Sequence, residues 1–229
     1  MSFERIVNNF PAGWRKTVDT WSELNNRYYE HNDDLPAWYV ENSNSALLSA
    51  AAWMNGYPAI CEMDVEKKSY TGTRGRPRSY AGRMDIEIQF DNKVYWIEAK
   101  RRAFTLSQNS NYSFRHSFLA SSVKDAMSNA RQCRDVAHGF GVSMASVVFF
   151  SGHIESDAPE RRGRDAPGRR AKLIHDETAA LKENMKALSD EICEDVYHAI
   201  YARNDVDIPR GWTDYHWPAA FGICAILDS

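Results

Sequence analysis

Two runs of alternating apolar and polar residues in the middle of the chain constrain its fold more than any other feature. Within 83–90 every second residue is apolar and would line one face of an extended strand, namely Met84, Ile86, Ile88 and Phe90. Two residues, Asp91 and Asn92, separate this run from a second one at 93–100. Strands joined by so short a turn pair as an antiparallel hairpin. We therefore expect a fold built around a β-sheet that contains this hairpin.

Helices and further strands are predicted on both sides of the hairpin. Apolar residues at steps of three and four predict one helix within the first 31 residues and a second from Pro36 to Gly56, with Asp34 as its N-cap. Further helices are expected at 121–138 and along the apolar stripe from Leu181 to Ile200. Short apolar runs predict the remaining strands, at 59–65, 143–152 and 221–228. This order of elements is typical of an α/β chain.

The length and composition favour a single domain over residues 1–229. A chain of 229 residues with 43% hydrophobic residues can bury a full core. We expect four parts: an N-terminal helical extension at 1–35, a core at 36–152, an exposed basic linker at 153–172, and a C-terminal helix and strand at 173–229.

Charge and cysteine usage exclude several classes of protein. The net charge of −3 argues against a basic nucleic-acid coat, yet residues 69–172 hold 18 basic and 10 acidic residues. The four cysteines form no CxxC pair, so a zinc ribbon and a small disulfide scaffold are not expected. No apolar run approaches the length of a membrane span, and no signal peptide is recognisable at the N-terminus. We expect a cytoplasmic protein without a membrane partner.

Three charged side chains of the hairpin are placed to meet on one side of the sheet. In the string GRMDIEIQFDNKVYWIEAKR, Glu98 and Lys100 share a face of the second strand, and Asp85 projects from the first. Two carboxylates close together in a partly buried site repel each other, and a divalent cation compensates that repulsion. Mg²⁺ suits oxygen ligands, with Mn²⁺ as a substitute. A cation so held can acidify a water for attack on a phosphodiester, with Lys100 near the water or the scissile phosphate.

This string resembles the motif of the PD-(D/E)xK nuclease superfamily, whose restriction-endonuclease-like core has the order helix, three strands, helix, strand. The elements predicted from Pro36 to Gly152 follow that order. The resemblance implies a mixed central β-sheet flanked by helices, with an N-terminal helix and a C-terminal helix plus strand added to the αβββαβ core. Met84 stands where the proline of the family's name would be, a departure that many members share.

The resemblance also implies roles for five residues. Asp85 corresponds to the first acid of the motif, Glu98 to the second and Lys100 to the lysine. Glu41 resembles the acid that many members present from the helix before the sheet. Gln132 is similar in place to a glutamine that some members set beside the metal site. The implied metal ligands are Asp85, Glu98 and Glu41.

Each of these residues also has a purely structural interpretation. Asp85, Glu98 and Lys100 could form a solvated sheet face with paired charges, although Trp96 on the same face indicates that it is covered. Glu41 could be a surface acid near a helix N-terminus, and Gln132 an exposed polar residue. Other acids of the sheet remain as alternatives: Glu87 as a partner of the site or a surface neighbour, and Glu62 with Asp64 as a substitute acid pair.

Basic residues precede and follow the acidic motif, with Tyr70 and Tyr80 among them. The set consists of Arg74, Arg76, Arg78, Arg83, Arg101 and Arg102. Contacts to a phosphate backbone need such a cationic surround, so we predict that these residues bind nucleic acid. The alternative is a solvated loop. A second arginine cluster at 161–170 lies in the predicted linker and supports only a nonspecific contact.

The sequence thus predicts a Mg²⁺-dependent deoxyribonuclease, an endonuclease acting in DNA restriction, defence, repair or recombination. A homodimer is the assembly that double-strand cutting by such a site would use. One alternative is a non-catalytic nucleic-acid-binding or accessory subunit with the same fold. Another is an interaction scaffold that uses the helix predicted at 172–203 as a partner face. Metal binding would separate the enzyme from both alternatives.

Overall fold

A computed structural model describes residues 3–32, 35–38, 40–69, 78–90, 92–106, 116–155, 166–203 and 216–228. The helices in these ranges are α1 (Ala12–Asn32), a 3₁₀ helix η1 (Pro36–Trp38), α2 (Glu41–Met54), α3 (His116–Gly139) and α4 (Ala166–Ile192). The strands are β1 (Phe3–Asn8), β2 (Ala59–Ser69), β3 (Arg78–Phe90), β4 (Lys93–Thr105), β5 (Ser143–Glu155), β6 (Val196–Arg203) and β7 (His216–Leu227).

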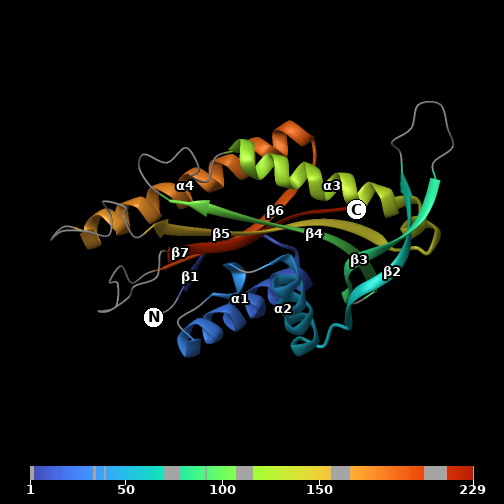
Figure 1. Cartoon of the computed structure of the whole chain (residues 1–229), viewed down its shortest axis with the longest axis horizontal. Coiled ribbons are helices and arrows are strands. Elements are labelled where there is room, and N and C mark those ends of the chain that lie inside the picture. The colour runs from blue at the N-terminus through green and yellow to red at the C-terminus, as the bar shows by residue number, and fades with distance from the viewer. Residues whose placement is uncertain are drawn as a thin grey trace.

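The described strands form one mixed sheet with the order β1-β6-β7-β5-β4-β3-β2. Only the central pair β4 and β5 is parallel, and the other pairs in this order are antiparallel. Figure 1 shows α1 and α2 on one face of the sheet and α3 and α4 on the other. The fold is therefore an α/β sandwich of three layers, in agreement with the predicted class.

The central strand β5 explains why the core has two halves. Val147 and Phe149 pack toward α1 and α2, where the tilted ring of Trp21 lies 5.6 Å from that of Phe149. Val148 and Phe150 pack on the opposite side, against α3 and α4. A strand that is buried on both faces needs a continuous apolar run, which is what the sequence has here.

Much of the predicted order of elements is confirmed. The hairpin forms with Phe90 opposite Lys93, and the helix, three strands, helix and strand from α2 to β5 follow each other as expected. Gly56 lies just past the end of α2 with a φ of +82°, which suits its predicted place after the helix. The start of that helix was placed too early, because residues 36–38 form a separate 3₁₀ turn and α2 begins at Glu41. The predicted cap, Asp34, lies outside the described residues.

Three elements differ from the prediction. β1 was not predicted, since it is a six-residue strand with a single buried residue. The expected linker is helical from Ala166 onward, and Arg170 is buried in it. The helix expected to reach Ile200 ends at Ile192. Cys193 follows with a φ of +55°, which no α-helix accommodates, and β6 then begins at Val196.

No helix in the described parts of the chain combines the length and the apolar character that a membrane crossing requires.

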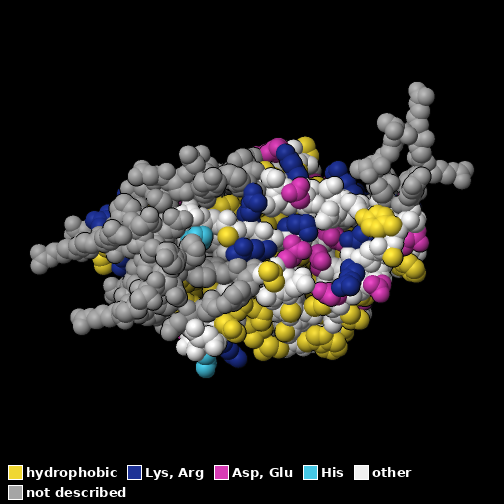
Figure 2. Space-filling model, viewed as in Figure 1, with side chains coloured by type: hydrophobic (Ala, Val, Ile, Leu, Met, Phe, Trp, Pro, Cys, Tyr) yellow, Lys and Arg dark blue, Asp and Glu magenta, His cyan; other side chains and the backbone are white. Residues whose placement is uncertain are grey.

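Figure 2 shows how charged and hydrophobic side chains are distributed on one face of the molecule. Lys, Arg, Asp and Glu side chains lie together in the middle of this face, next to a broad hydrophobic area over α1 and α2. The exposed apolar residues of these two helices include Tyr28, Trp53 and Met54.

Candidate functional site

The candidate site lies where β3 leaves β4. The two strands pair from the hairpin turn as far as Ile86 opposite Ile97, and β3 then continues with β2 as a two-stranded ribbon. β4 goes on beside β5 up to its last residue, Thr105. Figure 1 shows β2 and β3 curving away from the sheet at this end. Side chains from both helical layers can therefore meet in the opening.

Asp85 replaces a strand hydrogen bond at this opening. Its Oδ2 atom accepts a hydrogen bond from the backbone N–H of Ala99 in β4, with an N···O distance of 2.7 Å. Burial raises the pKa of both Glu41 and Glu98, and the nearby carboxylate of Asp85 adds to that rise. Asp85 is therefore close enough to interact electrostatically with an acid from α2 and an acid from β4.

One apolar residue of β3 packs on a different side from the others. The β2–β3 pairing passes from Cys61↔Ile86 to Met63↔Met84, and the residue between them in β2, Glu62, has a φ of +55°. Ile86, Ile88 and Phe90 share one face, as predicted, and pack toward α1 and α2. Met84 instead packs in the cluster formed with α3. The expected single face is therefore wrong for Met84, which lies where the paired strand β2 is irregular at Glu62.

Glu98 is buried and bound to a lysine that the sequence analysis did not single out. The Nζ atom of Lys67, in β2, donates a hydrogen bond to Glu98 Oε1 at 2.5 Å. Only 3% of the Glu98 side chain and 12% of the Lys67 side chain are exposed. Burial raises the pKa of Glu98, and the ion pair with Lys67 opposes that shift. Burial opposes the charge of Lys67, but its pKa is raised because the ion pair with Glu98 outweighs burial.

Lys100 binds the acid from the helical layer. Its Nζ atom lies 3.4 Å from Glu41 Oε1 and 2.6 Å from the carbonyl oxygen of Ala99. Both side chains of the pair are 29% exposed. Burial raises the pKa of Glu41, and Lys100 opposes the shift. Because Glu41 is the first residue of α2, the start of that helix is what brings the acid to the sheet.

Helix α3 forms one wall of the site through Cys133 rather than through Gln132. The thiol of Cys133 is buried and interacts electrostatically with Lys67, Glu98 and Asp85, and burial raises its pKa to about 11. Gln132 instead accepts a hydrogen bond from the hydroxyl of Tyr80 in β3 at 2.5 Å. The structure thus places Gln132 against the ribbon, and in the described part of the chain no hydrogen bond joins it to the predicted carboxylates.

The alternative acids are engaged elsewhere. Glu62 is exposed and pairs with Arg83 at 3.1 Å and with the amide of Asn42. Asp64 is exposed. Glu87 accepts a hydrogen bond from Trp96 Nε1 at 2.7 Å and so holds the indole beside the strand. These acids form no second site with a lysine among the described residues.

The predicted basic surround is only partly visible. Arg74 and Arg76 lie outside the described residues, as does the side chain of Arg78. Arg83 is exposed and bound to Glu62. Arg101 and Arg102 follow Lys100 on β4 as partly buried residues, and burial lowers the pKa of Arg101.

The carboxylates suit a hard cation in their chemistry. Glu41, Asp85 and Glu98 supply oxygen ligands, and their mutual repulsion is a cost that Mg²⁺ would relieve. Across the described ranges, however, no three His, Cys, Asp or Glu side chains form a ready-made metal cluster. Lys67 neutralises Glu98, and Lys100 neutralises Glu41. Ligation by Glu98 would therefore require Lys67 to move.

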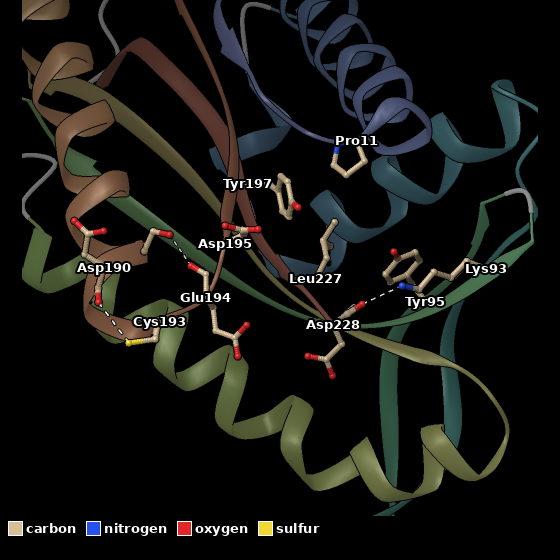
Figure 3. A pocket seen from close by; sticks show the side chains of 11 residues that line it. Pro11, Lys93, Tyr95, Asp190, Cys193, Glu194, Asp195, Tyr197, Leu227 and Asp228 are labelled. Carbon is tan, nitrogen blue, oxygen red and sulfur yellow. Dashed lines mark hydrogen bonds between the residues drawn. The ribbon is translucent and has the colours of Figure 1, made fainter.

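A separate cavity of about 680 Å³ lies at the other end of β4, beside the last turn of α4. Figure 3 shows the side chains that line it, among them Lys93, Tyr95, Asp190 and Asp195. Lys93 donates a hydrogen bond to the carbonyl of Asp228 at its edge. None of the predicted site residues lines this cavity, and its carboxylates would repel a phosphate.

Searches among protein-family models, curated proteins and solved structures found no match to this chain.

Proposed function

We propose that this protein is a Mg²⁺-dependent nuclease that hydrolyses DNA phosphodiester bonds. The observation that carries the proposal is the convergence of Glu41, Asp85, Glu98 and Lys100 at the point where β3 leaves β4. The order of elements from α2 to β5 supports a restriction-endonuclease-like core. Both features were expected from the resemblance to the PD-(D/E)xK superfamily.

The residues would divide the work as follows. Asp85, Glu98 and Glu41 would hold the cation, which supplies an acidified water and stabilises charge on phosphate oxygens. Lys100 lies beside Glu41 and the Ala99 carbonyl, so its ammonium group is held at the rim of the carboxylates. From there it would orient the attacking water or stabilise charge on the phosphate. A DNA partner, and a homodimer for double-strand cutting, belong to the same proposal.

The decisive experiment is cutting of circular, linear and single-stranded DNA in Mg²⁺, Mn²⁺ or EDTA. We expect cutting that requires the metal. Asp85→Asn and Lys100→Met should each reduce it by about 100-fold or more, because each removes a group that acts on the reacting phosphate. Glu66→Gln, which changes an exposed acid of the same sheet, is the matched control.

Cutting by Asp85→Asn at the wild-type rate would overturn the proposal. If the protein binds DNA but neither cuts it nor binds Mg²⁺ in calorimetry, the non-catalytic accessory subunit becomes the better explanation. The buried Lys67–Glu98 pair gives that alternative its one structural argument, since it leaves Glu98 already neutralised.

A further inference from the structure

The side chain of Lys67 is buried in the candidate site and hydrogen-bonded to one of the predicted residues. Its side chain leaves β2, crosses the neighbouring strand β3 and reaches Glu98 on β4. It crosses at Gly82, where a Cβ atom would lie only 2.7 Å from Lys67 Cδ and 2.8 Å from Lys67 Cγ. A glycine at this position is therefore what lets the lysine stem pass.

The neighbouring lysine shows what an ordinary surface pair looks like in the same strand. Lys68 binds Asp135 on α3 at 3.2 Å, and the two side chains are 30% and 58% exposed. Such exposed pairs stabilise a protein little and are easily replaced by water. Lys67 and Glu98, by contrast, are shielded from water, so each needs an oppositely charged partner at all times.

This need for a partner dictates what happens when Glu98 ligates a divalent cation. The cation then compensates the carboxylate and repels the ammonium group beside it. Lys67 remains anchored by its stem over Gly82, within the site, and requires another anion. A phosphate oxygen of the nucleic acid is the anion that the proposed reaction brings to this place.

We propose that Lys67 exchanges partners in this site, neutralising Glu98 in the free protein and binding a phosphate oxygen of the nucleic acid once Glu98 ligates a divalent cation. This inference rests on the proposed nuclease function. It adds a phosphate-binding lysine from β2 to the lysine that the sequence motif supplies from β4. The two ammonium groups would approach the phosphate from neighbouring strands on either side of β3.

The test uses Lys67→Met, which removes the ammonium group and keeps most of the stem. Calorimetry with Mg²⁺ alone should show binding about tenfold tighter than in the wild type, because the competing cation is gone. Binding of a short DNA duplex in Ca²⁺ should be at least about fivefold weaker, because a phosphate contact is lost. Lys68→Met, the adjacent surface lysine, should change neither quantity.

Gly82→Ala is a second variant that tests the same inference without removing a charge. It can be measured even if Lys67→Met fails to fold. The added Cβ displaces the lysine stem, so Mg²⁺ affinity should again rise. Unchanged or weaker Mg²⁺ binding in the folded variants overturns the inference, as does tighter Mg²⁺ binding with unchanged DNA affinity. Failure of the nuclease proposal would look different: the wild type would bind Mg²⁺ and leave DNA intact.

Discussion

Asp85 has two tasks in this structure, one in the fold and one in the proposed chemistry. Its carboxylate completes the hydrogen bonding of a buried strand residue, Ala99, and also acts on the charges of Glu41 and Glu98. A substitution at this position therefore changes stability and the site together. The two effects can be separated by the choice of side chain.

Asp85→Ala should lower the free energy of unfolding by about 1–3 kcal/mol, because it leaves the buried N–H of Ala99 without its acceptor. Asp85→Asn keeps an oxygen in place and should cost clearly less. Urea denaturation of both variants measures the difference. Equal losses in the two variants would show that the hydrogen bond to Ala99 contributes little to stability.

The cysteines should react in the order of their burial. Cys133 is buried with a pKa raised to about 11, so at pH 8 only about one thiol in a thousand is ionised. Cys193 is exposed. Iodoacetamide followed by mass spectrometry should modify Cys193 within minutes and Cys133 only after unfolding. Rapid labelling of Cys133 in the folded protein would contradict the packing of α3 against the site.

Most residues of the candidate site could be proposed from the sequence because they lie close together in it. Asp85, Glu98 and Lys100 belong to two adjacent strands whose alternation can be read directly, and Glu41 precedes them on a helix. Lys67 was missed because its partner lies 31 residues away, across a strand. A signal was present, since Lys67 shares its face with Met63 and Val65, which pack inward.

At the scale of the element, the predictions of secondary structure that proved wrong relied on local sequence patterns alone. Val196 and Ile200 continue the apolar spacing of α4, yet they belong to β6, because the chain turns at Cys193. The arginine-rich stretch after residue 165 was expected to be a linker, yet Pro167 lies in the first turn of α4, where proline is tolerated. Pairing with the two neighbouring strands, β1 and β7, is what makes 196–203 a strand.

Close packing of β7 against both its neighbours makes one glycine essential. A Cβ at Gly222 would lie 2.3 Å from the carbonyl oxygen of Ala199 and 2.4 Å from Phe150 Cζ. Gly222→Ala should therefore lower the free energy of unfolding by about 1–3 kcal/mol. Gly168→Ala in α4, where the Cβ meets nothing within 4 Å, is the control and should be neutral or slightly stabilising. Similar melting of both variants in calorimetry would refute the close contact.

At the scale of the whole molecule, the sheet joins the two ends of the chain. β1, at the N-terminus, pairs with β6, and Phe3 inserts between Tyr29 of α1 and Phe221 of β7, with ring distances of 5.8 and 4.9 Å. This pairing was beyond the reach of the sequence, because a short edge strand depends on a partner almost 200 residues away.

Phe3→Ala should lower stability by about 3 kcal/mol, and for a domain of this size that corresponds to a fall in Tm of roughly 6–12 °C. Because β1 belongs to the common sheet, the loss should move one cooperative transition. Differential scanning calorimetry is the measurement. Two separate transitions, or an unchanged Tm, would mean that β1 is docked on the sheet without contributing to its stability.

The departure of β3 from β4 also has a mechanical consequence. Lys67 belongs to the β2–β3 ribbon and Glu98 to β4, so their ion pair links the ribbon to the rest of the sheet beyond the last β3–β4 pair. Beyond this ion pair the ribbon contacts α3 through polar side chains, for example in the ion pair of Lys68 with Asp135. A ligand that displaces the ribbon therefore has to break the ion pair at the buried carboxylate of Glu98.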